Sequence, residues 1–86
     1  MNINQLISIV KKKLEKDINI EKIKVEDKSF LHKGHAGNKL GKFHLKISIQ
    51  SKDLKKMDRI KSNKKIYSIL SLEMRDFIHS LQILIE

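Results

Sequence analysis

The amino-acid sequence predicts an α/β (α+β) fold in which one small sheet is covered on one face by helices. Two observations carry this prediction. Apolar residues recur at helical spacing over 3–14, and they alternate strictly with polar residues over 43–50. The first pattern is typical of an amphipathic helix and the second of a half-buried strand. The predicted order is helix, two strands, two helices and one strand (α-β-β-α-α-β). The 86 residues are expected to form one domain, 1–86.

The N-terminal half is predicted to contain one helix and two strands. Asn2 and Gln5 have the spacing of a capping box, and the helix that they begin should end near Asp17. The first strand follows and ends at Asp27. A glycine-bearing loop over 28–41 then leads to the second strand, 43–50. We expect the two strands to pair in antiparallel fashion.

The C-terminal half is predicted to contain two helices and a last strand. Asp53 is expected to cap a short helix that carries Leu54, and Ser62 or Asn63 is expected to cap the next. The apolar stripe of that second helix comprises Ile66, Tyr67, Ile69, Leu70 and Met74. Residues 78–85 form the predicted final strand.

Composition narrows the classes of function. A chain this short has no room for a deep substrate pocket, so we do not expect an enzyme. It has no cysteine, which excludes disulfides and thiol chemistry within the chain. No apolar run approaches the roughly 18 residues of a membrane span, and the N-terminus does not resemble a signal peptide. We therefore expect a cytoplasmic protein that binds no membrane.

The histidines are the first candidates for chemistry. His79 has the same parity as the apolar residues of the final strand, so it should lie at the edge of the core. It is either a ligand or a buried neutral histidine, and the two roles are compatible. His32 and His35 form an H-x-x-H in the glycine loop, where solvated imidazoles are the alternative. His44 is expected on the surface of the second strand. A His32–His79 pair would supply half of a four-ligand cluster site.

The second candidate is the basic segment 52–65. The net charge of +9 invites a nucleic-acid interpretation, although only two of the 19 basic residues are arginine. The segment spans the predicted helix–turn–helix and is either a solvated helix face or a phosphate-contacting one. Its basic residues are Lys52, Lys55, Lys56, Arg59, Lys61, Lys64 and Lys65. A G-x-x-G at 34–37 matches the clamp of KH domains, but it lies between two strands instead of two helices.

Four segments together resemble the BolA family over essentially the whole chain. They are D-K-S-F-L-H at 27–32 followed by the glycine loop, H-L-K-I at 44–47 leading to Ser51, Ile66-Tyr67 with Leu70, and I-H-S-L at 78–81. Each segment is weak alone, but their order and spacing together are specific. Two positions depart from the family pattern. Residues 62–64 read Ser-Asn-Lys where the family usually has Arg-His-Arg, and 54–56 read Leu-Lys-Lys where it has Phe-x-Gly.

The resemblance implies a class II KH-like fold with a three-stranded mixed sheet and helices on one face. It implies a monothiol glutaredoxin as partner and a role in iron–sulfur or iron homeostasis and the stress response. In the family a bridging [2Fe–2S] cluster takes ligands from glutaredoxin, from glutathione, from the loop and from a C-terminal histidine. By position, His32 is the loop ligand, with His35 as an alternative, and His79 is the C-terminal one.

The chain alone is then expected to be a monomer without a cluster. Some BolA-like proteins also act as DNA-binding regulators. The alternative function is therefore a nucleic-acid-binding transcriptional regulator that uses the basic helix–turn–helix. Loss of both arginines at 62–64 weakens the case for sequence-specific binding to DNA.

Overall fold

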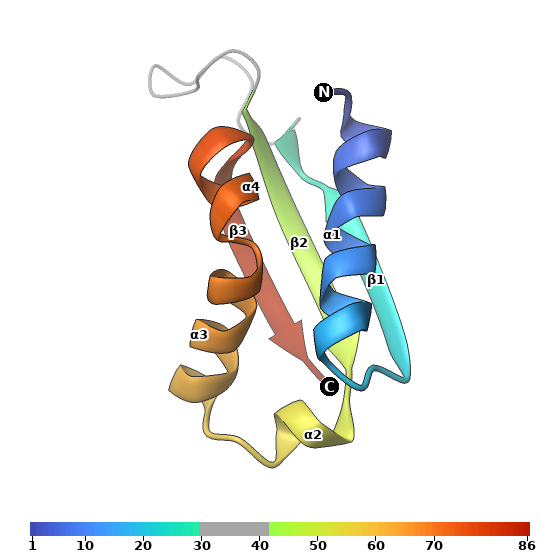
Figure 1. The fold of residues 1–86 in the computed structure, drawn as a ribbon, viewed down its shortest axis with the longest axis vertical. Coiled ribbons are helices and arrows are strands. Elements are labelled where there is room, and N and C mark those ends of the chain that lie inside the picture. Colours follow the sequence, from blue (N-terminus) through green and yellow to red (C-terminus); the bar gives the residue numbers. More distant parts are fainter. Residues whose placement is uncertain (30–41) are drawn as a thin grey trace.

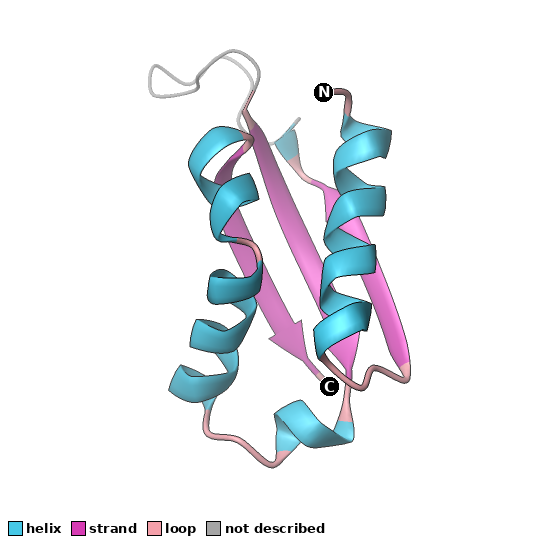
Figure 2. Cartoon of the chain, in the orientation of Figure 1, coloured by secondary structure: helices cyan, strands magenta, loops and turns pink. Residues whose placement is uncertain are grey.

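In the computed structural model, which describes residues 1–29 and 42–86, the long helices lie on one face of a three-stranded sheet (Figures 1 and 2). The elements follow in the order α1 (Ile3–Asp17), β1 (Lys22–Asp27), β2 (Phe43–Gln50), α2 (Lys52–Lys55), α3 (Arg59–Ile69), α4 (Ser71–Asp76) and β3 (Ile78–Ile85). The predicted order is confirmed, with α4 as an additional short helix after α3.

The sheet has β2 at its centre, and its strand order is β1-β2-β3. β1 pairs with β2 in antiparallel fashion, as predicted, and β3 pairs with β2 in parallel fashion. The parallel pair needs a crossover, which α2, α3 and α4 supply. On the helix-covered face, Leu45, Ile47 and Ile49 of β2 are at most 2% exposed and form the middle of the core. The predicted mixed sheet is therefore confirmed.

α1 is placed by its cap and by one apolar stripe. The Asn2 side chain accepts a hydrogen bond from the Gln5 backbone, and the Gln5 side chain accepts one from the Asn2 backbone, so the predicted capping box is present. Leu6, Val10 and Leu14, spaced four apart, are fully buried. This spacing turns all three onto the sheet.

Two predicted helix starts are wrong. Ser51, and not Asp53, caps α2, because its Oγ accepts from the Leu54 backbone N–H at 3.2 Å. Asp58 caps α3 through the Lys61 N–H at 2.8 Å, so the helix begins before Ser62. In each case the cap side chain accepts from the backbone N–H three residues later, which is the usual capping pattern. Ser62 instead lies inside the helix, buried, where its hydroxyl donates to the Arg59 carbonyl.

A partly buried ion pair connects α1 with α4. Lys13 Nζ lies 2.6 Å from Glu73 Oε2, and the Glu73 side chain is only 4% exposed. The other carboxylate oxygen, Oε1, has no hydrogen-bond partner among the described residues. A buried carboxylate is costly without its cation, so Lys13 holds α4, and with it the entry into β3, against α1.

Lys13→Met should lower the free energy of unfolding by about 1–3 kcal/mol, because it leaves the Glu73 carboxylate buried without its cation. Urea unfolding measures the change. Lys12→Met is the matched control, because Lys12 is exposed on the same helix and its loss should cost no more than about 0.5 kcal/mol. Equal effects of the two substitutions would show that the ion pair contributes nothing.

Candidate metal centre

A β-bulge at the start of β3 places His79. Phe43 is opposite Ile78, whereas the next residue of β2, His44, is opposite Ser80, so His79 is the extra residue of β3. The predicted position of His79 at the edge of the core is therefore wrong. Ile78 occupies the buried position with 2% exposure, and His79 is exposed. Beyond the bulge, Leu81 and the later odd-numbered residues face the helices as the alternation predicts.

His44 is buried, with 5% exposure, so its predicted surface position is also wrong. Its side chain lies on the sheet face opposite the helices, and that face is partly covered here. The chain after β1 continues alongside this end of β2, where the Lys28 N–H donates to the His44 carbonyl at 2.7 Å. The His44 N–H in turn donates to Ser29 Oγ at 3.0 Å. Part of the cover is the ring of His79, and the pattern of β2 alone does not show the bulge that places that ring here.

Two imidazoles meet at this point. The rings of His44 and His79 are in edge contact, with their centroids 4.9 Å apart and an interplanar angle of 62°. His44 Nδ1 lies 2.6 Å from Ser80 Oγ, so Ser80 fixes the orientation of the buried ring. The buried ring in turn limits the positions open to the exposed one. The site is thus an accessible imidazole supported by a hydrogen-bonded one.

The donor set decides which metal group these residues fit. Within 1–29 and 42–86, no three His, Cys, Asp or Glu residues come together as a possible metal site. A metal group held at the accessible imidazole of His79 would therefore need further ligands from outside these ranges or from other molecules. This fits a cluster held jointly with other molecules, because a cluster normally takes four ligands. His32 and His35, the predicted loop ligands, lie outside the described residues.

Two charge pairs lie among the described residues that flank this end of the sheet. The Lys28 ammonium, 3.0 Å from Glu26, lowers the pKa of the Glu26 carboxyl. Two hydrogen bonds from Arg75, at 2.9 and 3.1 Å, lower the pKa of Asp76. Both carboxylates are therefore ionised at neutral pH and are poor proton donors.

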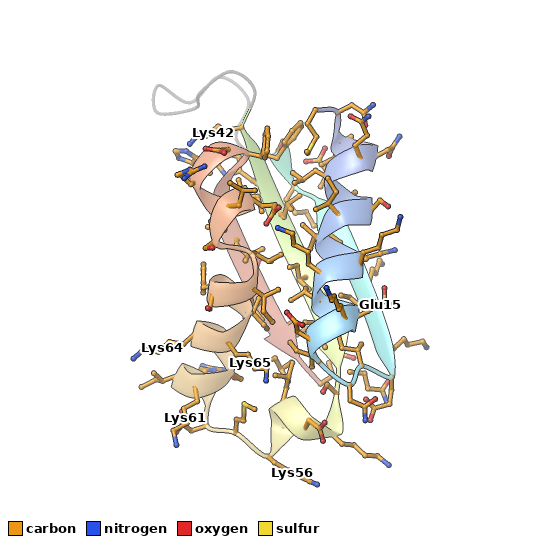
Figure 3. The ribbon with its side chains drawn as sticks, viewed as in Figure 1. Glu15, Lys42, Lys56, Lys61, Lys64 and Lys65 are labelled. Carbon is orange, nitrogen blue, oxygen red and sulfur yellow. The ribbon has the colours of Figure 1, made fainter. Side chains whose placement is uncertain are left out.

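The basic segment 52–65 forms the predicted helix–turn–helix, and all seven of its Lys and Arg residues are exposed. They do not point in one direction. Lys61 and Lys64 project from the outer side of α3, Lys56 projects away from α2, and Lys65 points towards the space between α3 and α1 (Figure 3). The basic side chains therefore surround the turn between α2 and α3. Only some of them can contact the same nucleic-acid duplex.

Comparison with known proteins decides the family. A family profile described as BolA-like protein matches residues 14–86. The chain belongs to the BolA-like family. Over 79 residues this BolA-like chain is 32% identical to Protein BOLA1, chloroplastic, of Arabidopsis thaliana. Over 73 residues it is 29% identical to the DNA-binding transcriptional regulator BolA of Haemophilus influenzae. These alignments cover 88% and 85% of the chain, but 49% and 68% of the relatives.

Solved structures confirm the BolA fold. The BolA domain of SufE1 from Arabidopsis thaliana superposes with a TM-score of 0.77 at 29% identity, and BolA1 from the same organism with 0.75 at 30%. Each comparison covers 92% of this chain and 87% of the other. The BolA-like domain is thus found both as a protein named for it and as a part of a longer one. No helix within the described ranges is long and apolar enough to cross a membrane.

Ser80→Ala should lower the free energy of unfolding by about 1–3 kcal/mol, because it removes a short hydrogen bond to a buried ring. It should also shift the NMR signals of the His79 ring, which lies against that of His44. Ser68→Ala is the control, because Ser68 is exposed on α3, outside the two strands that carry the rings. Unchanged His79 signals in Ser80→Ala would show that Ser80 does not support the pair.

Proposed function

We propose that this chain is a non-enzymatic BolA-like adaptor that binds a monothiol glutaredoxin and shares a bridging [2Fe–2S] cluster with it, in iron–sulfur or iron homeostasis. Membership of the BolA-like family supports the class of function. The observation that carries the proposal is the exposed His79 on the β-bulge, with its ring against the anchored ring of His44. An accessible imidazole with a fixed neighbour is suited to ligation.

The number of ligands that this chain can provide supports a cluster shared with another molecule. In this proposal His79 provides one nitrogen and His32, or His35 in its place, provides another. The chain has no cysteine, so thiolates must come from outside, from a glutaredoxin cysteine and from glutathione. Such a cluster supplies one-electron chemistry and a transferable iron–sulfur unit. Imidazole in place of thiolate raises the reduction potential, as at Rieske centres.

The support around His79 also bears on the orientation of its ring. A ligating imidazole must be neutral at the nitrogen that binds the metal, and its ring must be held in one orientation. In this chain the hydrogen bond between His44 and Ser80 fixes the neighbouring ring, and the edge contact transmits that restraint to His79. His44 is therefore proposed as a positioning residue of the site, and not as a ligand, because its side chain is buried, with 5% exposure.

His79→Ala should abolish the visible absorption of the bridged cluster when the chain is mixed with a monothiol glutaredoxin, iron, sulfide and glutathione. His79→Cys should retain a cluster with altered absorption and a lower reduction potential, because thiolate replaces imidazole. Gln82→Ala, an exposed change on the same strand, is the control and should leave the spectrum unchanged.

Two further outcomes decide the ligand assignment. An unchanged spectrum in His79→Ala would contradict it. Heterodimer formation without iron, followed by size exclusion, separates binding of the partner from ligation of the cluster. Circular dichroism of each variant checks that the exposed substitutions leave the fold intact.

A second candidate function is a nucleic-acid-binding transcriptional regulator. It is favoured by the relative of Haemophilus influenzae that is named a DNA-binding transcriptional regulator. The exposed basic helix–turn–helix, with Lys61 and Lys64 on the outer side of α3, is the surface proposed for phosphate contacts. Lysines contact phosphates but do not recognise specific bases, so this binding would depend strongly on salt concentration.

The double variant Lys61→Glu, Lys64→Glu should abolish DNA binding if this second function holds, and binding by the unchanged protein should weaken steeply with salt. The double variant Lys12→Glu, Lys16→Glu on α1 carries the same total charge change and should retain binding. Fluorescence anisotropy with a labelled duplex at several salt concentrations measures both. Equal losses in the two double variants would indicate attraction by net charge alone.

A further inference from the structure

The outer edge of β3 is an open edge of the described sheet. Among the described strands, β3 lies at one edge of the sheet and β1 at the other. β1 has four charged residues among its six, which is a common protection against edge pairing. β3 has no charged residue in its eight (I-H-S-L-Q-I-L-I). The two edges therefore differ, and the one formed by β3 is not protected by charge.

The direction of the backbone groups follows from two hydrogen bonds. The Glu86 N–H donates to the Ile49 carbonyl at 2.7 Å, so the even-numbered positions beyond the bulge turn their backbone groups towards β2. In a parallel pair alternate residues turn away, so Leu81, Ile83 and Ile85 present theirs to the outer edge. The Tyr67 hydroxyl confirms this direction, because it donates to the Leu81 carbonyl at 3.2 Å. Ile83 and Ile85 thus form the accessible part of the edge.

A hollow of about 180 Å³ lies beside this part of the edge. Its walls include Ile83–Ile85 from β3 and the apolar side chains of Leu54 and Met57, and Lys55 and Arg59 add positive charge. Small-molecule sites usually measure about 300–1,000 Å³. The hollow is therefore sized for a single apolar side chain of a longer segment that lies along the strand.

We propose that the edge of β3 at Ile83–Ile85 pairs with an extended acidic segment of a partner protein. The partner's backbone adds a strand to the sheet, one of its apolar side chains fills the hollow, and its acidic side chains lie towards Lys55 and Arg59. This is strand addition, in which main-chain hydrogen bonds give affinity and the pocket gives selectivity. The proposal is independent of the histidine site.

Two other occupants fit less well. Single-stranded nucleic acid usually stacks its bases on aromatic side chains, and none of the residues that line the hollow is aromatic. A second copy of this chain would bring two net charges of +9 together. An acidic segment satisfies both the backbone edge and the positive charge.

The test uses a pool of acetylated and amidated decapeptides with glutamate at alternate positions and varied apolar residues between. In NMR titrations of the ¹⁵N-labelled full chain, the pool should shift the amide signals of Ile83 and Ile85 most. The same pool with N-methylated apolar residues cannot donate its hydrogen bonds. It should bind at least about fivefold more weakly, since two lost hydrogen bonds at about 0.5–1.5 kcal/mol each correspond to such a change.

Arg59→Glu should weaken binding of the unmethylated pool by about fivefold, as the loss of an exposed ion pair predicts. Lys12→Glu, the same charge change on α1, should leave it unchanged. The absence of shifts at Ile83 and Ile85 at millimolar peptide, or equal binding of the methylated pool, would overturn the proposal. Tighter binding of an oligothymidine at these amides, or a dimer in sedimentation of the free chain, would also overturn it, in favour of nucleic acid or a second copy.

Discussion

The β-bulge between β2 and β3 is the constraint on which the candidate site depends. One extra residue in β3 lets Ile78 fill the core at the start of the strand and Leu81 continue the core face beyond it. The residue left over is His79, which has no position on either regular face. A bulge re-aims one side chain at the cost of local pairing. In this molecule it turns an imidazole from the core towards the solvent.

The residues around the bulge hold His79 in place through a series of contacts. β2 fixes His44, the hydrogen bond between Ser80 and Nδ1 fixes its ring, and that ring lies against His79. The Ser29 hydroxyl accepts from the His44 backbone N–H and so joins the chain after β1 to this end of β2. On the other side, the Lys13–Glu73 ion pair holds α4, which leads directly into β3. A single exposed side chain thus depends on α1, α4 and all three strands.

The regular elements were predictable because each follows from local pattern. The Asn2–Gln5 capping box and the strict alternation over 43–50 are complete within their own segments, and both are confirmed. The two wrong helix caps arose where two neighbouring residues were equally suitable as caps. Ser51 and Asp53 can each cap a helix, and so can Asp58 and Ser62. The choice between them depends on where Leu54 and Ile66 must lie to be buried, which is a property of the packed core.

The sequence alone determined the class of the fold, the order of its elements and the family, because hydrophobic periodicity and the order of motifs can be read without coordinates. It also determined that any thiolate must come from another molecule, because the chain has no cysteine. Only the tertiary structure decided that His79 is exposed and His44 is buried. Alternation assigns faces correctly only while the register between strands is unbroken, and a bulge is a relation between two strands that neither strand shows by itself.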